Sequence, residues 1–371
     1  MNFASLCCQI KDVVLNVTSW NPARDGYDQI IRYIDLSSVN QDTKTIHLNE
    51  PVVARESPSR ARQLVQTGDV LVSTVRPNLN GVAIIDASLD GATASTGFCV
   101  LRPDEEKLDR AYLFHWVKTS EFISDMVRKA TGASYPAVSD RIVLESKIPL
   151  PSIAEQKRIA AILDKAEELR GLRRKALGEL NAIVQSIFLE MFGDPTKNPK
   201  HSIASIRPFV KAGSGKSSKR VLSSTPTDIP IYGGNGINGY AIQSLYSKPV
   251  LVVGRVGQQC GKTYVTDKPV WVTDNAIAVE ITSRERLNLT YLLHVFSMTH
   301  MSETVKHLDL PFVNQQMILD FPLPIPPISL QQQFARRVEA IEHLKTIHRE
   351  SLAHPDALFA SLQHRAFRGE L

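Results

Sequence analysis

The chain has 371 residues, of which 43% are hydrophobic and 22% charged, as is ordinary for a soluble globular protein of two or three domains. It carries no apolar run of membrane-spanning length, no secretory-type start, and no CxxC spacing or disulfide framework, so a reduced, cytoplasmic compartment is expected. The net charge of +5 permits an acidic partner without requiring one.

Residues 1–147 are rich in β-branched runs separated by glycine, proline and asparagine, which predicts short strands joined by turns. The run Asp69–Val75 is the clearest strand, and Arg76 follows it. A second strand is expected from Thr96 to Leu101, then a helix that begins near Tyr112 and a loop around Tyr135. We therefore expect this region to form one α/β domain.

Residues 148–195 follow a helical pattern. Apolar side chains recur at alternating steps of three and four residues from Ile153 to about Met191, which is typical of the a/d seam of a coiled coil. Gly193-Asp194-Pro195 should end the helix. The expected seam residues are Ile159, Ile162, Ala166, Leu169, Leu180, Ile183 and Ile187.

Residues 196–322 repeat the plan of the first region, with a strand at Pro249–Gly254, then Arg255, and a helix that begins near Tyr291. Residues 323–371 carry a second, weaker helical pattern, which Pro355 should break or kink after His354. Its expected seam residues are Phe334, Ile341, Leu344, Leu358 and Leu362.

The two helical segments are copies of each other. I-P-L-P-S-I-A-E-Q-K-R-I at 148–159 matches L-P-I-P-P-I-S-L-Q-Q-Q-F at 323–334, with 175 positions between Pro149 and Pro324, and Ala182–Phe192 matches Ala357–Phe367 at the same separation. A long repeat usually means one structural unit used twice, so we expect approximate two-fold symmetry. A long helix with a narrow apolar stripe needs a partner, and the other copy is the obvious one. Alternatively, each helix covers the domain beside it. The predicted class is α+β, with two α/β domains joined by two long helices.

Motifs for chemistry fail their context. Ala212–Ser217 lacks the first glycine and the helix of a phosphate loop, and Gly234–Gly239 matches GxGxxG without the long helix and acidic residue of a dinucleotide site. His294, His300 and His307 lack partners at metal-ligand spacing, and no nucleophile–base pair stands out. We therefore expect neither an active site nor a bound metal.

Over its whole length the chain resembles the specificity subunit of type I restriction–modification enzymes. The resemblance is carried by Ile148–Arg170, by F-L-E-M-F-G-D-P at Phe188–Pro195, by S-L-Q-H-R-A-F-R-G-E-L at Ser361–Leu371, and by Ile231–Tyr240. It implies two target-recognition domains, 1–147 and 196–322, which each read one half of a split DNA target in the major groove. It also implies two spacer helices, 148–195 and 323–371, that form an antiparallel coiled coil and set the half-site spacing.

The same resemblance implies a non-catalytic subunit. Its partners would be double-stranded DNA, two methyltransferase (modification) subunits docked on the helices, and restriction subunits through the complex. No cofactor is implied for this chain, because in the family S-adenosylmethionine, ATP and Mg bind the partner subunits. Since the two domains differ in sequence, we expect an asymmetric target.

Sequence-specific readout needs Arg, Asn or Gln on base edges, with Lys, Ser and Thr on phosphates, all presented on loops. In the first domain the candidates are Arg76, Asn78, Asn80, Ser95, Thr96, Tyr135, Ser139 and Arg141. In the second domain they are Lys216, Lys219, Arg220, Tyr232, Asn235, Asn238, Arg255, Gln258, Lys262, Asn275 and Asn314.

Two other hypotheses remain open. A self-contained nuclease or methyltransferase with an unrecognised site would cut DNA with magnesium or bind S-adenosylmethionine by itself. A coiled-coil adaptor without a role on DNA would lose no DNA affinity when Arg76 and Arg255 are both replaced by alanine.

Overall fold

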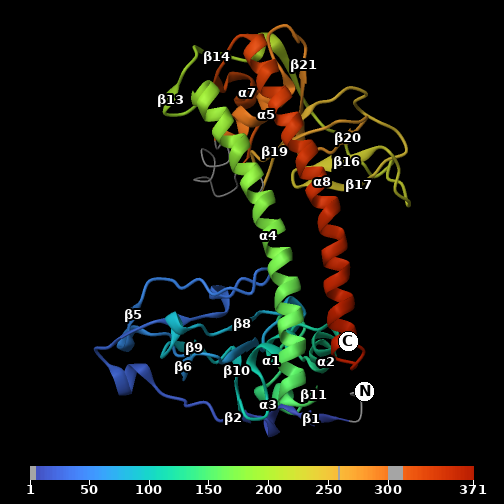
Figure 1. Ribbon diagram of the computed structural model, residues 1–371. Helices are drawn as coiled ribbons and strands as arrows, with labels where there is room; N and C mark the ends of the chain where they lie inside the picture. The colour runs from blue at the N-terminus through green and yellow to red at the C-terminus, as the bar shows by residue number, and fades with distance from the viewer. Residues whose placement is uncertain (1–5, 258–259, 300–311) are drawn as a thin grey trace. The chain divides into compact units, whose positions relative to one another are not determined.

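The computed structural model describes residues 6–257, 260–299 and 312–371, with the side chains of 352–354 left out. The chain divides into two compact units, which we call unit 1 (Met1–Arg173 with Ser351–Leu371) and unit 2 (Arg174–Glu350). Each unit contains one β-rich region, the beginning of one long helix and the end of the other (Figure 1). The predicted α+β class, with two β-rich domains and two long helices, is confirmed.

Unit 1 is built around a four-stranded antiparallel sheet and a three-stranded mixed sheet. The first sheet has the order β2 (Val14–Leu15), β10 (Phe98–Pro103), β7 (Val70–Ser73), β8 (Val82–Ile84), and the second has the order β4 (Tyr33–Ile34), β9 (Thr93–Ser95), β6 (Ala61–Leu64). Two short pairs complete the strands: β1 (Cys7–Gln9) with β11 (Lys147–Pro149), and β3 (Ile30–Ile31) with β5 (Val52–Val53). The helices are α1 (Arg110–Val117), α2 (Ser120–Lys129) and α3 (Asp140–Leu144).

Unit 2 repeats this plan. Its four-stranded sheet has the order β15 (Val210–Ser214), β21 (Ala276–Ile281), β18 (Leu251–Gly254), β19 (Thr263–Val265), and its three-stranded sheet has the order β17 (Gly236–Tyr240), β16 (Pro230–Gly233), β20 (Trp271–Val272). The short pairs are β14 (Ile203–Ser205) with β22 (Pro322–Pro324), and β12 (Gly193–Asp194) with β13 (Asn198–Pro199). The described helices besides the long ones are α5 (Leu289–Met298) and α7 (Gln315–Asp320).

The first long helix, α4, extends over Ile153–Phe192, as its sequence pattern predicts. The second, α8, extends over Ile328–Ala366 with Pro355 inside it, so the expectation that Pro355 breaks this helix is wrong. A proline removes one backbone hydrogen bond but leaves the side chains around it free to pack. Here Asp356 forms an ion pair with Arg170 at 2.6 Å, and Phe359 is buried. These contacts hold the helix together beyond the proline.

The buried row of each long helix differs from the predicted seam. Ile159, Phe334 and Ile341 are buried as expected, and Ile162, Ala166, Leu180, Ile187 and Leu362 are half-buried. Leu169, Ile183, Leu344 and Leu358 are exposed, which corrects the prediction for these four. The reason is that the helices pack against their domains as well as against each other, so the buried row in α4 passes through Leu163, Val184, Phe188 and Phe192 instead.

Within unit 1 the beginning of α4 and the end of α8 lie side by side and run antiparallel (Figure 1). Arg170 pairs with Asp356, whereas the earlier residue Arg158 donates to the backbone carbonyl of the later residue Leu371. Both helix segments contribute to one apolar core with α1 and the four-stranded sheet. In unit 1 the helix segments therefore pack against the domain as well as against each other, so the alternative, in which each helix covers an adjoining domain, holds in part.

A buried glutamine fixes the beginning of α4 to the first domain. The Gln156 side chain is fully buried, and its Nε2 donates to the carbonyl oxygens of Lys107 and Pro151 at 2.9 Å each. Its Oε1 accepts a bond from the amide of Asp109 at 2.9 Å. The hydroxyl of Tyr112, a residue of α1, donates to the carbonyl of Pro149 at 3.0 Å. These bonds join the segment that begins α4 to α1 and to the loop before it.

The same arrangement recurs at the beginning of α8. Gln331 Nε2 donates to the carbonyls of Arg286 and Pro326 at 3.0 and 2.8 Å, and its Oε1 accepts from the amide of Asn288 at 2.9 Å. The Tyr291 hydroxyl donates to the carbonyl of Pro324 at 2.7 Å. Buried amide groups are costly unless they are paired, so this repeated contact set, which we call the glutamine latch, fixes each helix to its domain in one register.

The end of each long helix packs against the other domain through an aromatic residue. In unit 1, the ring of Phe367 lies 5.0 Å from Tyr112 and 5.1 Å from Trp116, measured between ring centroids. In unit 2, Phe192 lies 4.8 Å from Tyr291 in an edge-on contact. Each domain therefore holds the start of its own helix and the end of the other one. The sequence repeat reflects this pair of contacts.

Candidate nucleic-acid interface

Three loops of unit 1 meet at Thr74, directly after β7. The amide and the hydroxyl of Thr74 both donate to the carbonyl of Gly97 at 2.9 Å, and the amide of Val138 donates to the carbonyl of Thr74 at 2.9 Å. The exposed candidates Thr96 and Ser139 stand next to these bonds in the chain. The backbone therefore brings candidates from separate parts of the sequence to one end of the sheet.

Arg76, Asn78 and Tyr135 also lie on these loops, and all three are exposed. The guanidinium carbon of Arg76 lies 4.6 Å from the centre of the Tyr135 ring. The amide of Arg76 donates to the carbonyl of Pro136 at 2.7 Å, which fixes the two loops to each other. Of the predicted residues in unit 1, these three form the clearest group.

The corresponding loops of unit 2 meet at Arg255. Its amide donates to the carbonyl of Asn275 at 3.0 Å, and its carbonyl accepts from the amide of Val313 at 2.8 Å. A fourth loop joins these three, because the amide of Lys216 donates to the carbonyl of Val272 at 2.9 Å. A side chain at Gly215 would collide with the carbonyl of Thr273, so this glycine permits a close approach of the two backbones.

Most of the remaining polar candidates of unit 2 have exposed side chains. Asn235 lies in the turn between β16 and β17, next to Gly236, which adopts a φ of +95°, and Asn238 lies within β17. Lys262 lies over the ring of Tyr264 at 5.7 Å, and Arg255 is half-exposed. The other exposed candidates are Lys216, Lys219, Arg220 and Asn275.

Three candidates have roles in the fold, and for Ser95, which is buried, this corrects the prediction. Ser95 is fully buried, and Asn80 uses its side-chain amide to donate to the carbonyl of Val117 at 2.9 Å. Asn314 caps α7 by accepting a bond from the amide of Met317 at 2.9 Å. These polar residues occupy turns, where Asn and Ser satisfy nearby backbone groups.

The last three candidates are Tyr232, Arg141 and Gln258. Tyr232 is half-buried and packs against the core of the second domain. Arg141 is exposed and pairs with Glu145, with 2.9 Å between Nε and Oε1. Gln258 lies outside the described residues.

Sequence reasoning missed Lys44, which supports the Arg76 loop from a distant part of the chain. Its ammonium group donates to the backbone carbonyl of Asn80 at 2.6 Å and to the side-chain oxygen of Asn80 at 3.0 Å. Burial lowers the pKa of Lys44 to about 8. No local pattern around residue 44 distinguishes it from a surface lysine, so only the tertiary structure could have identified it.

Where α4 meets the first domain, charged groups are partly buried. His115 is buried and bonds through Nε2 to Asp164 on α4 at 2.7 Å, and Lys118 pairs with Glu167 on the same helix at 3.2 Å. Burial lowers the pKa of His115 below its usual value, and the bond to Asp164 opposes that shift. In unit 2, burial likewise lowers the pKa of His294, whose Nδ1 bonds to the carbonyl of Thr290 at 2.8 Å. In both histidines, burial favours the neutral form of the ring.

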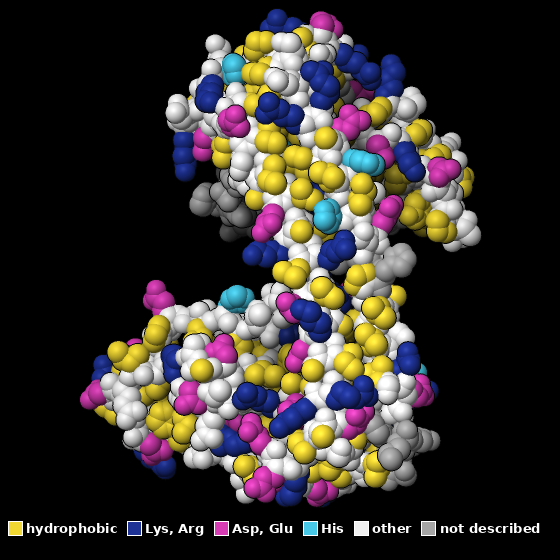
Figure 2. Space-filling view, viewed as in Figure 1, with side chains coloured by type: hydrophobic (Ala, Val, Ile, Leu, Met, Phe, Trp, Pro, Cys, Tyr) yellow, Lys and Arg dark blue, Asp and Glu magenta, His cyan; other side chains and the backbone are white. Residues whose placement is uncertain are grey.

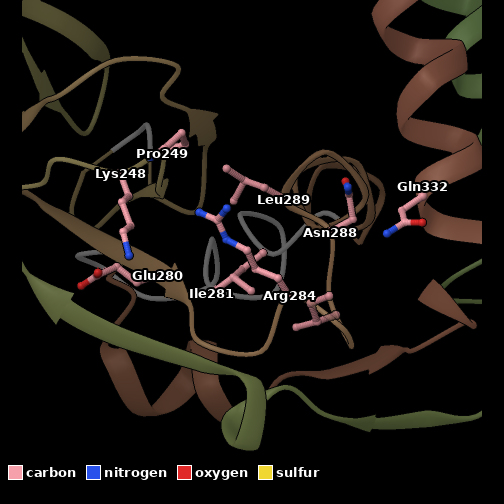
Figure 3. A pocket seen from close by; sticks show the side chains of 9 residues that line it. Lys248, Pro249, Glu280, Ile281, Arg284, Asn288, Leu289 and Gln332 are labelled. Carbon is pink, nitrogen blue, oxygen red and sulfur yellow. The ribbon is translucent and has the colours of Figure 1, made fainter. Parts of the chain in front are cut away.

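A surface pocket of unit 2 has no arrangement typical of catalysis. Its lining includes Lys248, Glu280 and Arg284, with aliphatic residues between them (Figure 3). None of its lining residues is a predicted DNA contact. Within the described ranges no group of three or more His, Cys, Asp or Glu side chains is arranged to hold a metal ion, and His300 and His307 lie outside those ranges.

Comparison with known proteins gives a consistent picture. A family model described as the type I restriction modification DNA specificity domain matches residues 40–182 and 204–354. The chain is 24% identical over 143 residues to the type I restriction enzyme HindI specificity subunit of Haemophilus influenzae, which covers 38% of this chain and 31% of that protein. It is 21% identical to the putative MjaX specificity subunit of Methanocaldococcus jannaschii, over 92% of this chain and 88% of that protein.

The match to HindI thus spans about a third of that relative's length. The fold is similar to the crystal structure of the type I restriction–modification S subunit from M. genitalium, with a TM-score of 0.56 at 16% identity, over 97% of this chain and 95% of that one. Within its described part, this chain has no helix with the length and apolarity to traverse a lipid bilayer.

Proposed function

We propose that this chain, which belongs to the family of type I restriction modification DNA specificity domains, reads a bipartite DNA target with the loops of its two units. The observation that carries the proposal is a scaffold used twice with different exposed loops. The glutamine latch and the aromatic helix end recur in both units, whereas the polar residues around Thr74 and Arg255 differ. A structure that keeps its frame and varies its polar loops is suited to sequence-specific binding.

Because the exposed loops of the two units differ, we expect the two half-sites to differ in sequence. Unit 1 exposes Arg76, Asn78 and Tyr135, and unit 2 exposes Asn235 and Asn238 together with several lysines. Arg and Asn side chains distinguish base pairs in the major groove, and lysines bind phosphates. We expect an asymmetric target that each unit reads in the major groove, with affinity that falls steeply as salt rises.

The long helices are proposed to set the separation of the half-sites. The 40 residues of α4 would extend over ~60 Å at 1.5 Å per residue. Half-sites in successive major grooves lie roughly 34 Å apart. A helical spacer of this length is sufficient for such a separation, and an antiparallel coiled coil would make it stiff.

The same helices are proposed to bind two methyltransferase subunits, one for each copy of the repeat. Exposed apolar side chains on α4 and α8 support a protein contact there, since such side chains favour partners over water. They are Leu169, Leu172, Ile183, Leu189, Leu344, Ile347 and Leu358. Figure 2 shows hydrophobic side chains between basic and acidic ones on the helical face of unit 2.

Restriction subunits would join through that complex, which would act on DNA in the cytoplasm. S-adenosylmethionine, ATP and magnesium would be bound by the partner subunits, and this chain would itself be non-catalytic. The proposal for this chain is therefore recognition and assembly.

One experiment tests this function directly. The chain is co-expressed with the methyltransferase subunits of a type I system in cells without other adenine methylation, purified, and the DNA of those cells is sequenced for methylated adenine. We expect a stable complex and one motif made of two unlike halves with unread positions between them. Methylation without any motif, or with the same motif when this chain is omitted, would contradict the proposal.

A further inference from the structure

The backbone of unit 1 is strained at one place. Among the described residues, Lys44, Arg76 and Asn80 are the non-glycine residues with positive φ, at 60°, 50° and 46°. Residues other than glycine reach this left-handed conformation at an energetic cost, which is smallest for asparagine. Two of the three belong to the turn after β7, and the third, Lys44, bonds to Asn80 within it. Such strain persists only where surrounding contacts enforce it, and it is concentrated at functional sites.

The contacts that enforce it are on the turn itself. At one end, Val75 forms a β-bridge with Ala137, and the amide of Arg76 donates to the carbonyl of Pro136 at 2.7 Å. At the other end, the Asn80 side chain donates to the carbonyl of Val117 at 2.9 Å and accepts from Lys44. The turn from Arg76 to Asn80 is therefore held at both ends in a single conformation.

The turn presents the guanidinium group of Arg76 to solvent, next to the exposed side chain of Asn78. Arg76 is exposed, and its guanidinium carbon lies 4.6 Å from the centre of the Tyr135 ring, which is itself 69% exposed. In the described part of the chain no carboxylate lies within ion-pair distance of Arg76. A guanidinium over an aromatic face keeps its N–H edge available while losing little further freedom on binding.

This chemistry fits a guanine edge better than a phosphate. Guanine offers O6 and N7 side by side in the major groove, and a planar guanidinium can donate to both at once. A phosphate contact has no need for a fixed side chain, because any mobile lysine or arginine provides one. Unit 2 has no counterpart in its described residues, since Arg255 does not adopt positive φ and no aromatic ring is recorded over it.

We propose that Arg76, held against Tyr135 by the strained turn, reads one guanine of the half-site that unit 1 recognises. This inference rests on the proposed function and names the base and the residue within it. Arg76 is then a specificity-determining residue, and the strain in the turn keeps it in the reading position.

Because Arg76 has a left-handed φ, its replacement by glycine should not destabilise the turn. Glycine adopts this conformation without cost, so Arg76→Gly removes the side chain and relieves the strain together. Thermal melting should therefore show a midpoint at or above that of the wild type. In the reconstituted complex with methyltransferase subunits, we expect affinity for the matched duplex to fall roughly 10- to 100-fold, with an unchanged salt slope.

Methylation sequencing with the same variant should give a motif that is relaxed at one G·C position of one half only. Arg76→Lys keeps the charge but loses the paired donors, so it should relax the same position. Tyr135→Phe keeps the ring and should leave the motif unchanged, whereas Tyr135→Ala should relax it partly. Arg24→Ala, which removes another exposed arginine of unit 1, is the matched control and should leave the motif unchanged.

Several results would overturn the inference. One is an equal loss on matched and mismatched duplexes with a salt slope smaller by about one, which is the signature of a phosphate contact. Another is an unchanged motif in Arg76→Gly or Arg76→Lys, or relaxation at a position that is not G·C. In these cases the wild-type complex still methylates a bipartite motif. Failure of the proposed function itself is distinct, because then the wild-type complex gives no motif.

Discussion

Individual buried polar residues define where the helices meet the domains. Gln156 and Gln331 are fully buried, and each bonds to two carbonyl oxygens and one amide of its own unit. The amide side chain satisfies three backbone groups that helix starts and loops would otherwise leave unpaired. At this scale the sequence repeat is informative, because the two glutamines are matched positions within it.

Removing one latch should destabilise the unit that contains it. Gln331→Ala leaves buried backbone groups of Arg286, Pro326 and Asn288 unpaired, so we expect a loss of about 1–3 kcal/mol in the free energy of unfolding of unit 2. Urea denaturation followed by hydrogen exchange locates the effect. Gln333→Ala, an exposed position on the same helix, is the matched control. An equal effect of both variants would show that the latch contributes nothing specific.

The buried histidines predict a pH dependence. Burial lowers the folded-state pKa of His115 and of His294, so the unfolded chain binds more protons than the folded chain as the pH falls below about 6.5. Stability should therefore decrease on acidification, starting near the unfolded-state pKa and levelling off below the folded-state value. Urea midpoints between pH 7.5 and 5 measure it, and His115→Gln should flatten the curve. A midpoint that rises over this interval would contradict the assignment.

At the scale of elements, the ends of the long helices complete the opposite domains. Phe367, near the end of α8, packs between Tyr112 and Trp116, and Phe192, at the end of α4, packs on Tyr291. Aromatic residues bury large areas and so make efficient anchors for a helix end. Each β-rich region therefore packs against a helix end from a distant part of the sequence.

Loss of one anchor should affect one unit. Phe367→Ala removes a buried ring from unit 1 and should cost about 3–5 kcal/mol there. Hydrogen exchange should show faster exchange in α1 and in the beginning of α4, and unchanged exchange in α5. Leu358→Ala, an exposed position on the same helix, should cost less than about 0.5 kcal/mol. Uniformly faster exchange in both units would contradict the assignment of Phe367 to unit 1.

The sequence predicts the elements well and their contacts less well. The α4 helix is bounded as expected, because periodicity and the Gly-Asp-Pro stop are local signals. The seam is displaced at Ile183 because Val184, Phe188 and Phe192 face the domain core, which periodicity alone does not reveal. Pro355 stays within α8 because tertiary contacts around Asp356 and Phe359 outweigh one lost hydrogen bond.

The candidate site shows the same division. Arg76, Asn78 and Tyr135 could be named from loop chemistry, and the structure brings them together. The burial of Ser95 and the helix-capping role of Asn314 could not be predicted from the sequence, because both depend on the tertiary fold. Lys44 was missed since its role depends on a bond to Asn80 across 36 positions.

At the scale of the whole molecule, one chain carries two versions of the same unit. Each version keeps the strand order of its four-stranded sheet, the glutamine latch and the aromatic anchor, while the order of the three-stranded sheet and the loops that expose polar side chains differ. Both α4 and α8 contribute residues to both units. Such a molecule is suited to hold two different recognition surfaces on one frame.

We propose that the two units read different halves of one DNA target. Methylated-adenine sequencing of cells that contain the complete complex tests it most directly, with the wild type, Arg76→Ala and Arg255→Ala compared under the same conditions. We predict a bipartite motif with two unlike halves, in which each variant relaxes or abolishes recognition in a different half. A single uninterrupted motif, or the same half affected by both variants, would contradict it.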